Sequence, residues 1–372
     1  MLEKYGHGGD LRSASELFGK KEEELLDYSS NMNPLGPPQS FKRVIEEYWK
    51  QIVHYPDPVQ RELITAIANR HQQEEERIIV GNGAAELIDL IVRQLQPKKA
   101  ALLIPSFVEY EQAILKAGCK AIYIETNEQT SFIPTLDQLK QVHDSEQPEL
   151  YMLGYPNNPT GTLIPIEHIL YLLEEGATVV VDEAFLDFHL EEERLSMIQW
   201  LHKYKRLFVI RSMTKFYSIP GIRLGYMMGD QHVIRALKQL QYPWSVNSLA
   251  QKLGCSAFKE TEFIAQTKAW LAEEIPWMTE ELKKIGLKPY ATVTNYMLVD
   301  IGENYSTNSR QLQQLMGKRG ILIRDAGTFR GLSDRYIRLA IKSRENNYRL
   351  LQVLADVLND YREEEPNVAN RS

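Results

Sequence analysis

The sequence predicts an α/β protein: a large domain with a mostly parallel, doubly wound sheet, followed by a smaller α+β domain at the C-terminal end. A chain of 372 residues is long enough for about two domains at roughly 150 residues each. Apolar residues make up 43% and charged residues 25%, which is typical of a globular protein and excludes a disordered or fibrous chain. Up to about residue 230, short apolar runs alternate with amphipathic stretches, as in doubly wound sheets.

The N-terminal segment, residues 1–36, is rich in Gly, Ser, Asn and Pro and shows little periodicity. Such a composition predicts an extended arm with turns. Apolar positions then recur at helical spacing over 41–52 and 59–71, and the segment Tyr55-Pro56-Asp57-Pro58 between them forms a rigid break. Two helices are therefore expected before the first strand.

Short apolar runs predict the strands of the large domain, residues 37–260. They lie at 78–80, 101–104, 121–124, 150–153, 178–181, 207–210 and 224–227. Strands that are apolar on both sides are usually covered on both faces, and the amphipathic stretches between them supply that cover. This pattern indicates a mostly parallel sheet between two layers of helices.

The small domain is expected over residues 261–361. Helical periodicity dominates from about residue 248 to 285, strand-like runs follow at 296–299, 321–323 and 336–339, and a last helix is expected near 346–361. The remaining residues, 362–372, form a polar tail that is expected to fray.

Charge and cysteine content exclude several classes of protein. With 43 Lys plus Arg against 50 Asp plus Glu, the net charge of −7 disfavours nucleic acid or anionic lipid as a partner. Cys119 and Cys255 are too few for a disulfide framework and lack zinc-site spacing, so no metal is expected. The sequence has neither a signal-like N-terminus nor an apolar run long enough to span a bilayer, which predicts a cytoplasmic protein without membrane contact.

The most informative motif is residues 212–226, directly after an apolar strand. Ser212 stands three residues before Lys215, and Arg223 stands eight residues after it. The carboxyl end of a strand is where α/β sheets bind ligands. Lys215 can form an imine with an aldehyde, while Ser212 and Arg223 can hold a phosphate by charge-assisted hydrogen bonds. The alternative is a surface lysine beside a structural arginine.

Asp182 ends the apolar strand at 178–181. A carboxylate there is costly to bury unpaired, so it needs a cationic partner. A protonated pyridine nitrogen would serve, because the ion pair keeps the ring charged and makes it an electron sink. Metal binding and capping of a turn are equally open for an aspartate in this place.

Two further turns follow predicted strands. Gly83 leads into Ala84 and Ala85 at the start of a helix, whose free backbone N–H groups can receive a phosphate. Asn158 lies in the segment 156–161, where the following proline can hold its side chain rigidly. Both segments are also common as plain turns.

Together these elements resemble the fold type I pyridoxal phosphate enzymes, and within them the histidinol-phosphate aminotransferase-like branch. The resemblance covers roughly residues 5–355 and implies pyridoxal 5'-phosphate as the cofactor. It identifies Lys215 with the lysine that bonds the cofactor aldehyde and Asp182 with the partner of the ring nitrogen. Asn158 is similar to the donor to the phenolic oxygen, and Phe107 to the aromatic residue that stacks on the ring. The implied phosphate ligands are Ala84, Ala85, Ser212 and Arg223.

The resemblance also implies an assembly and a substrate contact. Tyr55 is similar to a tyrosine that reaches the cofactor phosphate of the neighbouring subunit, which implies a homodimer. Arg338 is similar to the arginine that takes the substrate carboxylate as a bidentate pair.

Aminotransferases of this branch usually carry a tyrosine three residues after the aspartate, and here that residue is Phe185. The segments at 7–10, 28–36, 182–188 and 243–247 instead resemble the threonine-phosphate decarboxylase family. This resemblance implies a carboxy-lyase of cobalamin biosynthesis that converts L-threonine O-3-phosphate to (R)-1-amino-2-propanol O-2-phosphate and carbon dioxide. Histidinol-phosphate aminotransferase or a related aminotransferase is the alternative.

A substrate with a carboxylate and a phosphate needs two anchors. Arg338 is expected at the carboxylate, and the candidates for the phosphate are Arg324, His7 and Asn31. Gly8 and Asn158 are also expected to contact the substrate. Considered without the resemblance, His7 is expected to be an exposed side chain near a terminus, and Arg324 is expected to be a charged side chain on the surface.

Overall fold

The computed structural model describes residues 7–361, so the first six residues of the predicted arm and the predicted tail at 362–372 lie outside the described residues. Its larger sheet confirms the predicted doubly wound class. The strands run in the order β2 (Ile78–Gly81), β8 (Gly225–Met228), β7 (Leu207–Ser212), β6 (Thr178–Asp182), β5 (Leu150–Gly154), β3 (Lys99–Ile104) and β4 (Lys120–Glu125). All neighbouring strands are parallel except β8, which runs antiparallel to both β2 and β7.

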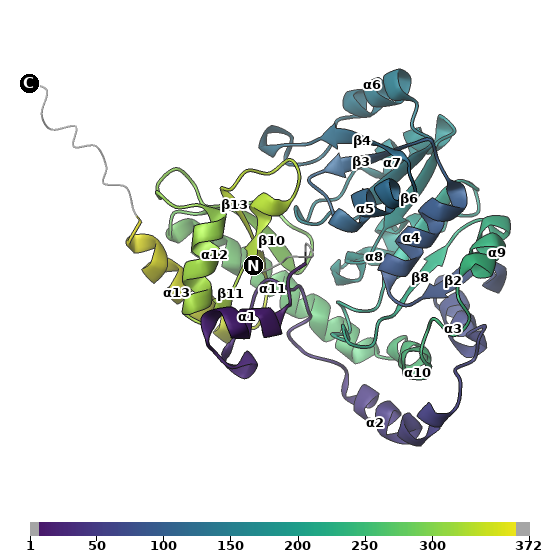
Figure 1. The fold of residues 1–372 in the computed structure, drawn as a ribbon, viewed down its shortest axis with the longest axis horizontal. Helices are drawn as coiled ribbons and strands as arrows, with labels where there is room; N and C mark the ends of the chain where they lie inside the picture. The colour runs from purple at the N-terminus through teal and green to yellow at the C-terminus, as the bar shows by residue number, and fades with distance from the viewer. Residues whose placement is uncertain (1–6, 362–372) are drawn as a thin grey trace, which may run out of the picture.

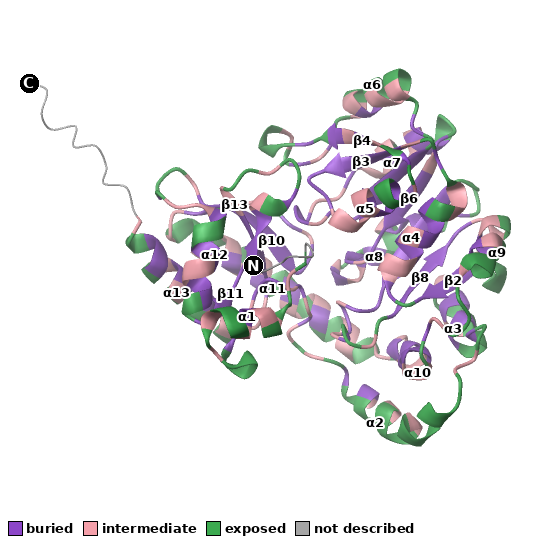
Figure 2. Cartoon of the chain, viewed as in Figure 1, coloured by how far each residue is buried: buried purple, intermediate pink, exposed green. Residues whose placement is uncertain are grey.

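Helices cover both faces of this sheet, because its central strands are apolar on both sides. Each face of the sheet packs against its own cluster of buried apolar side chains: Val180 belongs to one cluster, and Val179 and Val181 belong to the other, as the two-residue period of a strand requires. Apolar side chains of α4 (Ala84–Leu95), α5 (Val108–Lys116) and α9 (Gln231–Leu240) complete the first cluster. Those of α3 (Arg61–His71), α6 (Leu136–Glu146), α7 (Ile166–Glu174) and α10 (Ser248–Ala257) contribute to the second. Figure 2 shows the strands in the buried colour and the outer faces of the helices exposed.

The smaller sheet is antiparallel and lies in the C-terminal part of the chain. Its order is β12 (Arg324–Asp325), β13 (Tyr336–Ala340), β10 (Tyr296–Asp300) and β9 (Lys288–Pro289). The accompanying helices are α11 (Thr261–Lys284), α12 (Ser309–Lys318) and α13 (Arg344–Asn359). Figure 1 shows the two sheets in separate halves of the molecule, with α11 between them.

The N-terminal segment differs from the extended arm that its composition predicts. It contains a helix, α1 (Leu11–Phe18), which starts where the Asp10 carboxylate accepts a hydrogen bond from the backbone N–H of Ser13. Strand β1 (Leu26–Asp27) then pairs in parallel with β11 (Ile321–Leu322) of the small domain. The helix forms because apolar residues at helical spacing in α1 bury against β11, a long-range contact that local composition does not reveal.

The remaining elements connect these layers. They are η1 (Glu22–Glu24), α2 (Gln39–Tyr48), η2 (Trp49–Val53), η3 (Glu75–Arg77), η4 (Glu128–Thr130), η5 (Leu186–Phe188), α8 (Glu192–Leu195), η6 (Met197–Trp200) and η7 (Ala326–Thr328). Within residues 7–361, no helix is both long enough and apolar enough to cross a membrane.

Candidate active site

A cavity of about 380 Å³ lies at the carboxyl ends of β6 and β7 and is also lined by residues of the small domain. A concave site of this size suits a small-molecule ligand. Of the residues that the sequence singled out, the cavity brings together His7, Gly8, Asn31, Ala84, Ala85, Phe107, Asn158, Asp182, Ser212, Lys215, Arg223, Arg324 and Arg338. Tyr55 is the exception and lies elsewhere on the surface.

Lys215 follows β7 and lines the cavity. Burial, together with the nearby guanidinium groups of Arg338 and Arg223, lowers the pKa of Lys215 to about 8 against the opposing effect of Asp27. Its side chain is therefore neutral in a substantial fraction of molecules slightly above neutral pH. A neutral amine is the form that attacks an aldehyde.

Asp182 is the last residue of β6 and is 5% exposed. Its two oxygens accept hydrogen bonds from the Tyr110 hydroxyl at 2.9 Å and the Ala184 backbone N–H at 3.0 Å. Burial raises the pKa of Asp182 against the lowering effect of these two hydrogen bonds, and the result is a pKa of about 6. A buried carboxylate held in this way is suited to a cationic ring nitrogen. Tyr110 was not identified from the sequence; its only signal is its position one helical turn after Phe107.

The start of α4 forms a cradle for a phosphate. Its N-cap, Gly83, offers no side chain to the first N–H groups of the helix, so those at Ala84 and Ala85 can bind an anion. Gly83 has a φ of +83°, and a Cβ there would lie 2.5 Å from Arg223 Nη2. Glycine is therefore required for the guanidinium to reach this turn. With buried Ser212 beside it, this cradle fits the phosphate of pyridoxal phosphate.

Phe107 and Asn158 lie in the same cavity wall. The Phe107 ring packs edge-on against Tyr110, with ring centres 5.6 Å apart. Arg338 Nη1 donates to Asn158 Oδ1 at 2.6 Å. Because this oxygen accepts from Arg338, the amide nitrogen of Asn158 is the end that can donate to a ligand.

Two arginines form the small-domain wall of the cavity. Arg324 and Arg338 face each other in register across β12 and β13 and are 3% and 5% exposed. Residues directly opposite each other in an antiparallel pair share one face of the sheet. Arg338 Nη2 also donates to the Ser29 carbonyl at 2.6 Å, and Arg324 Nη2 donates to Thr328 Oγ1 at 3.2 Å. Two like charges side by side favour a ligand with more than one anionic group.

The N-terminal segment closes the cavity beside these arginines. Asn31 is 3% exposed, and its side-chain oxygen has no hydrogen-bond partner among the described residues. His7 Nε2 lies 2.7 Å from Glu109 Oε1, and this contact lowers the pKa of Glu109. Gly8 packs so closely on the Ser29 carbonyl that a Cβ would lie 2.3 Å from the oxygen. Glu109 is a second cavity residue that the sequence analysis did not identify.

Phe185 makes the wall near Asp182 apolar. It is 7% exposed and packs edge-on against Tyr296, with ring centres 4.9 Å apart. The Tyr296 hydroxyl donates to the Asn157 carbonyl at 2.8 Å, so it is already engaged with the backbone.

Tyr55 lies outside the cavity formed by its own chain. It is 81% exposed, and its ring centre is 4.8 Å from that of Trp244. Among the described residues, no group of three His, Cys, Asp or Glu side chains is placed to hold a metal ion.

Comparisons with known proteins identify the family of the chain. The model of the family "Aminotransferase class I and II" matches residues 23–354. The chain is 34% identical over 361 residues to the threonine-phosphate decarboxylase of Salmonella typhimurium, covering 95% of this chain and 96% of that protein. It is 37% identical over 358 residues to a protein of Caldanaerobacter subterraneus subsp. tengcongensis, whose name provisionally assigns the same activity, covering 95% and 94% of the two chains.

Solved structures show the same fold. The crystal structure of histidinol-phosphate aminotransferase from Clostridium acetobutylicum superposes with a TM-score of 0.84 at 32% identity, covering 90% of this chain and 100% of that chain. Enzymes of the class I and II aminotransferase family bind pyridoxal phosphate, and one solved neighbour of this chain is in complex with it. The chain belongs to the class I and II aminotransferase family of pyridoxal phosphate-dependent enzymes, and within it to the threonine-phosphate decarboxylase branch.

Proposed function

We propose that this protein is a carboxy-lyase that converts L-threonine O-3-phosphate to (R)-1-amino-2-propanol O-2-phosphate and carbon dioxide. The observation that carries the proposal is the pair Arg324 and Arg338, in register in one cavity wall opposite Lys215 and Asp182. A substrate with both a phosphate and a carboxylate matches two adjacent guanidinium groups. The identity of 34% to a threonine-phosphate decarboxylase over nearly the whole chain supports the same substrate.

Pyridoxal phosphate would be held by residues of the large domain. Lys215 would bind its aldehyde, Asp182 its ring nitrogen, Phe107 its ring face and Asn158 its phenolic oxygen. The residues for its phosphate are Ala84, Ala85, Ser212 and Arg223. When bound, this cofactor supplies an electron sink for the electron pair that remains at Cα when a bond to Cα breaks.

The chain's own residues decide which bond breaks and where the proton goes. Arg338 binds the substrate carboxylate and fixes its direction, while Arg324, His7 and Asn31 hold the substrate phosphate. The bond from Cα to the carboxylate breaks, carbon dioxide leaves and the electron pair stays at Cα. Lys215 Nζ is placed in the cavity to return a proton to Cα, which completes the amine product.

Histidinol-phosphate aminotransferase is the second candidate, because a solved enzyme of that name is 32% identical to this chain. The apolar Phe185 argues against it, since the aminotransferases of this branch usually have a tyrosine there. His7 in the cavity wall also favours the decarboxylase.

One incubation tests the proposal. The protein, loaded with pyridoxal phosphate, receives L-threonine O-3-phosphate without any 2-oxo acid, and both carbon dioxide and the amine are measured. Release of both in equal amounts is expected. If neither forms, but histidinol phosphate with 2-oxoglutarate yields glutamate, the protein is an aminotransferase and the proposal is wrong.

We also propose that the protein is a cytoplasmic homodimer. Tyr55 packs against Trp244, and Trp49, Val53 and Tyr242, which lie close to one or the other in the chain, are also large and exposed. A patch of large apolar side chains favours a protein interface, and Tyr55 would reach the cofactor phosphate of the second subunit across it. Sedimentation should give twice the mass of one chain, and Val53→Glu should yield monomers with weakened cofactor binding.

The reaction places the protein in cobalamin biosynthesis, where an aminopropanol phosphate is incorporated. The name of another relative, 28% identical over 94% of this chain, refers to adenosylcobalamin biosynthesis, and this supports the assignment. Deletion of the gene should create a requirement for the aminopropanol phosphate in cells that make cobalamin without an external source.

A further inference from the structure

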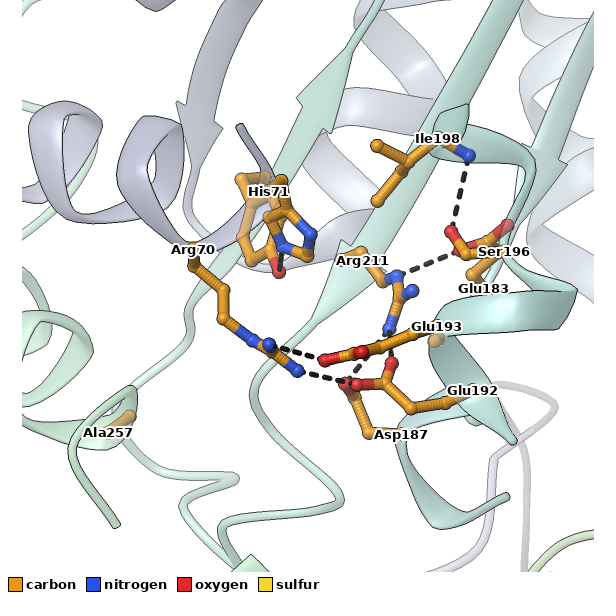
Figure 3. Close-up of polar contacts among 12 residues, drawn as sticks. Arg70, His71, Glu183, Asp187, Glu192, Glu193, Ser196, Ile198, Arg211 and Ala257 are labelled. Atoms are coloured by element: carbon orange, nitrogen blue, oxygen red, sulfur yellow. Dashed lines mark hydrogen bonds and ion pairs between the residues drawn. The ribbon is translucent and has the colours of Figure 1, made fainter. Parts of the chain in front are cut away.

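A buried group of charges lies on the face of β6 and β7 that is opposite the cavity. At its centre is Arg211, which is 1% exposed. Its Nε lies 2.8 Å from Glu183 Oε2, and its Nη1 lies 2.9 Å from Asp187 Oδ1 and 3.0 Å from Glu192 Oε2. Figure 3 shows the guanidinium between these carboxylates, with Arg70 reaching the outer side of the group. Arg211 therefore joins three segments of the large domain.

Glu183 is the innermost of the three carboxylates and is fully buried. Its Oε2 also accepts a hydrogen bond from Ser196 Oγ at 2.8 Å, and its Oε1 accepts one from the Met197 backbone N–H at 2.6 Å. Both oxygens are thus held in place from two sides. Glu183 is therefore positioned by contacts other than its ion pair with Arg211.

The position of this pair relative to the cavity follows from strand geometry. Glu183 comes directly after Asp182, and Arg211 comes directly before Ser212. The backbone N–H of Glu183 donates to the Ile210 carbonyl at 2.8 Å, which keeps the two strand ends paired up to this point. Because successive side chains of a strand alternate between faces, Asp182 and Ser212 face the cavity while Glu183 and Arg211 face away from it.

We propose that the Glu183–Arg211 pair is a positioning device for the cofactor, an inference that rests on the proposed pyridoxal phosphate site. It ties the end of β6, which presents Asp182 to the ring nitrogen, to the end of β7, which presents Ser212 to the phosphate. A buried ion pair is weak evidence for stability, because apolar residues of the same volume are often as stable. What this pair provides is a fixed distance between the anchor for the ring nitrogen and the anchor for the phosphate of one ligand.

The chain offers a matched control for this inference. Glu192 also contacts Arg211, at Nη1 rather than Nε, and is also buried; it pairs with Arg70 as well and lies on α8, away from both anchors in the sequence. Glu183→Gln and Glu192→Gln each remove one carboxylate charge and leave two carboxylates on Arg211. If the group serves only the stability of the domain, the two variants should behave alike.

The experiment measures cofactor binding rather than decarboxylation. Apoprotein of the wild type, Glu183→Gln and Glu192→Gln is titrated with pyridoxal phosphate, and the thermal midpoint of each apoprotein is recorded. We expect the Kd of Glu183→Gln to rise about tenfold or more and that of Glu192→Gln to stay within about twofold, at similar losses in thermal midpoint. We also expect the pH midpoint of the bound cofactor's absorbance to shift in Glu183→Gln alone, because Asp182 is displaced from the ring nitrogen.

Three results would overturn the inference: equal Kd values for the wild type and Glu183→Gln, equal rises in both variants, or a spectrum with an unchanged pH midpoint. Wild-type protein that binds no pyridoxal phosphate would instead overturn the proposed function, so the two failures are distinguishable. If Glu183→Gln does not fold, Glu183→Asp replaces it. That variant keeps the charge but shortens the reach to Arg211, and the same contrast with Glu192→Gln applies.

Discussion

The two walls of the cavity are built in different ways. The large-domain wall is made of residues at the ends of neighbouring parallel strands and at the start of a helix, and most of them lie in short motifs such as residues 212–226. The small-domain wall depends on Arg324 and Arg338, which lie 14 positions apart in the chain and meet only through antiparallel register. The first wall suits a cofactor, and the second suits the anionic groups of a substrate.

This difference separates reaction chemistry from substrate choice. Residues that handle the cofactor come from a scaffold that many enzymes share, so their spacing predicts the cofactor but not the reaction. In the proposed function, the arginine pair and the N-terminal segment select the substrate and direct its carboxylate. Substitutions in the two walls should therefore give different kinetic signatures.

The largest effect should come from the large-domain wall. Among the described residues that line the cavity, Lys215 is the only lysine, so Lys215→Ala removes the amine that would bond the aldehyde and return a proton, and kcat should fall about 10⁴-fold or more. The yellow colour of the loaded enzyme should also be lost. Lys342 is a suitable control: burial lowers its pKa as well, but it does not line the cavity. Steady-state activity retained by a verified Lys215→Ala protein would remove this lysine from the mechanism.

The two walls also differ in how far the sequence predicts them. The apolar runs identified every strand of the large sheet, because a strand that is buried on both faces has a distinctive local pattern. Lys215 and Asp182 were candidate site residues because each comes at or shortly after the carboxyl end of an apolar run. The helix α1, the contact of Tyr110 with Asp182 and the pairing of Glu109 with His7 were not predicted, because each depends on residues far apart in the chain.

Substrate anchors were identified through family resemblance rather than through local pattern. The strand that contains Arg324 has two residues, too short for any periodicity, and its pairing with β13 brings the second arginine opposite. Register between antiparallel strands depends on the whole domain, so a single sequence does not reveal it.

The next largest effect should come from the small-domain wall. Arg338→Gln and Arg324→Gln each remove a buried cation that lines the cavity; where such a cation pairs with a substrate anion, its loss typically costs about 2–5 kcal/mol in binding, or roughly 30-fold to several thousandfold. KM for L-threonine O-3-phosphate should rise accordingly, while Kd for the cofactor changes little. Arg335→Gln is the control, because Arg335 pairs with Asp300 away from the cavity. A larger effect on cofactor Kd than on KM would contradict the assignment of substrate binding to the small-domain wall and cofactor binding to the large-domain wall.

A pH dependence of cofactor binding should be intermediate in size. Burial raises the pKa of Asp182 to about 6, so below that pH the carboxyl is protonated and must release its proton before it can pair with a cationic ring nitrogen. Cofactor affinity of the apoprotein should therefore fall up to about tenfold per pH unit below pH 6. In Asp182→Asn this slope should vanish and affinity should be low throughout. An unchanged slope in Asp182→Asn would assign the titration to another group.

The smallest effect should come from Tyr110, whose hydroxyl donates to Asp182 at 2.9 Å. Tyr110→Phe removes one hydrogen bond worth about 1 kcal/mol, so cofactor affinity should fall about fivefold. Because this bond lowers the pKa of Asp182, its loss should also move the pH midpoint of cofactor binding upward. Tyr151→Phe is the matched control, since Tyr151 is also buried but contacts His143 instead of the site. A midpoint that stays in place would show that Tyr110 only fills space, and the large-domain wall would then hold Asp182 through the backbone of Ala184 alone.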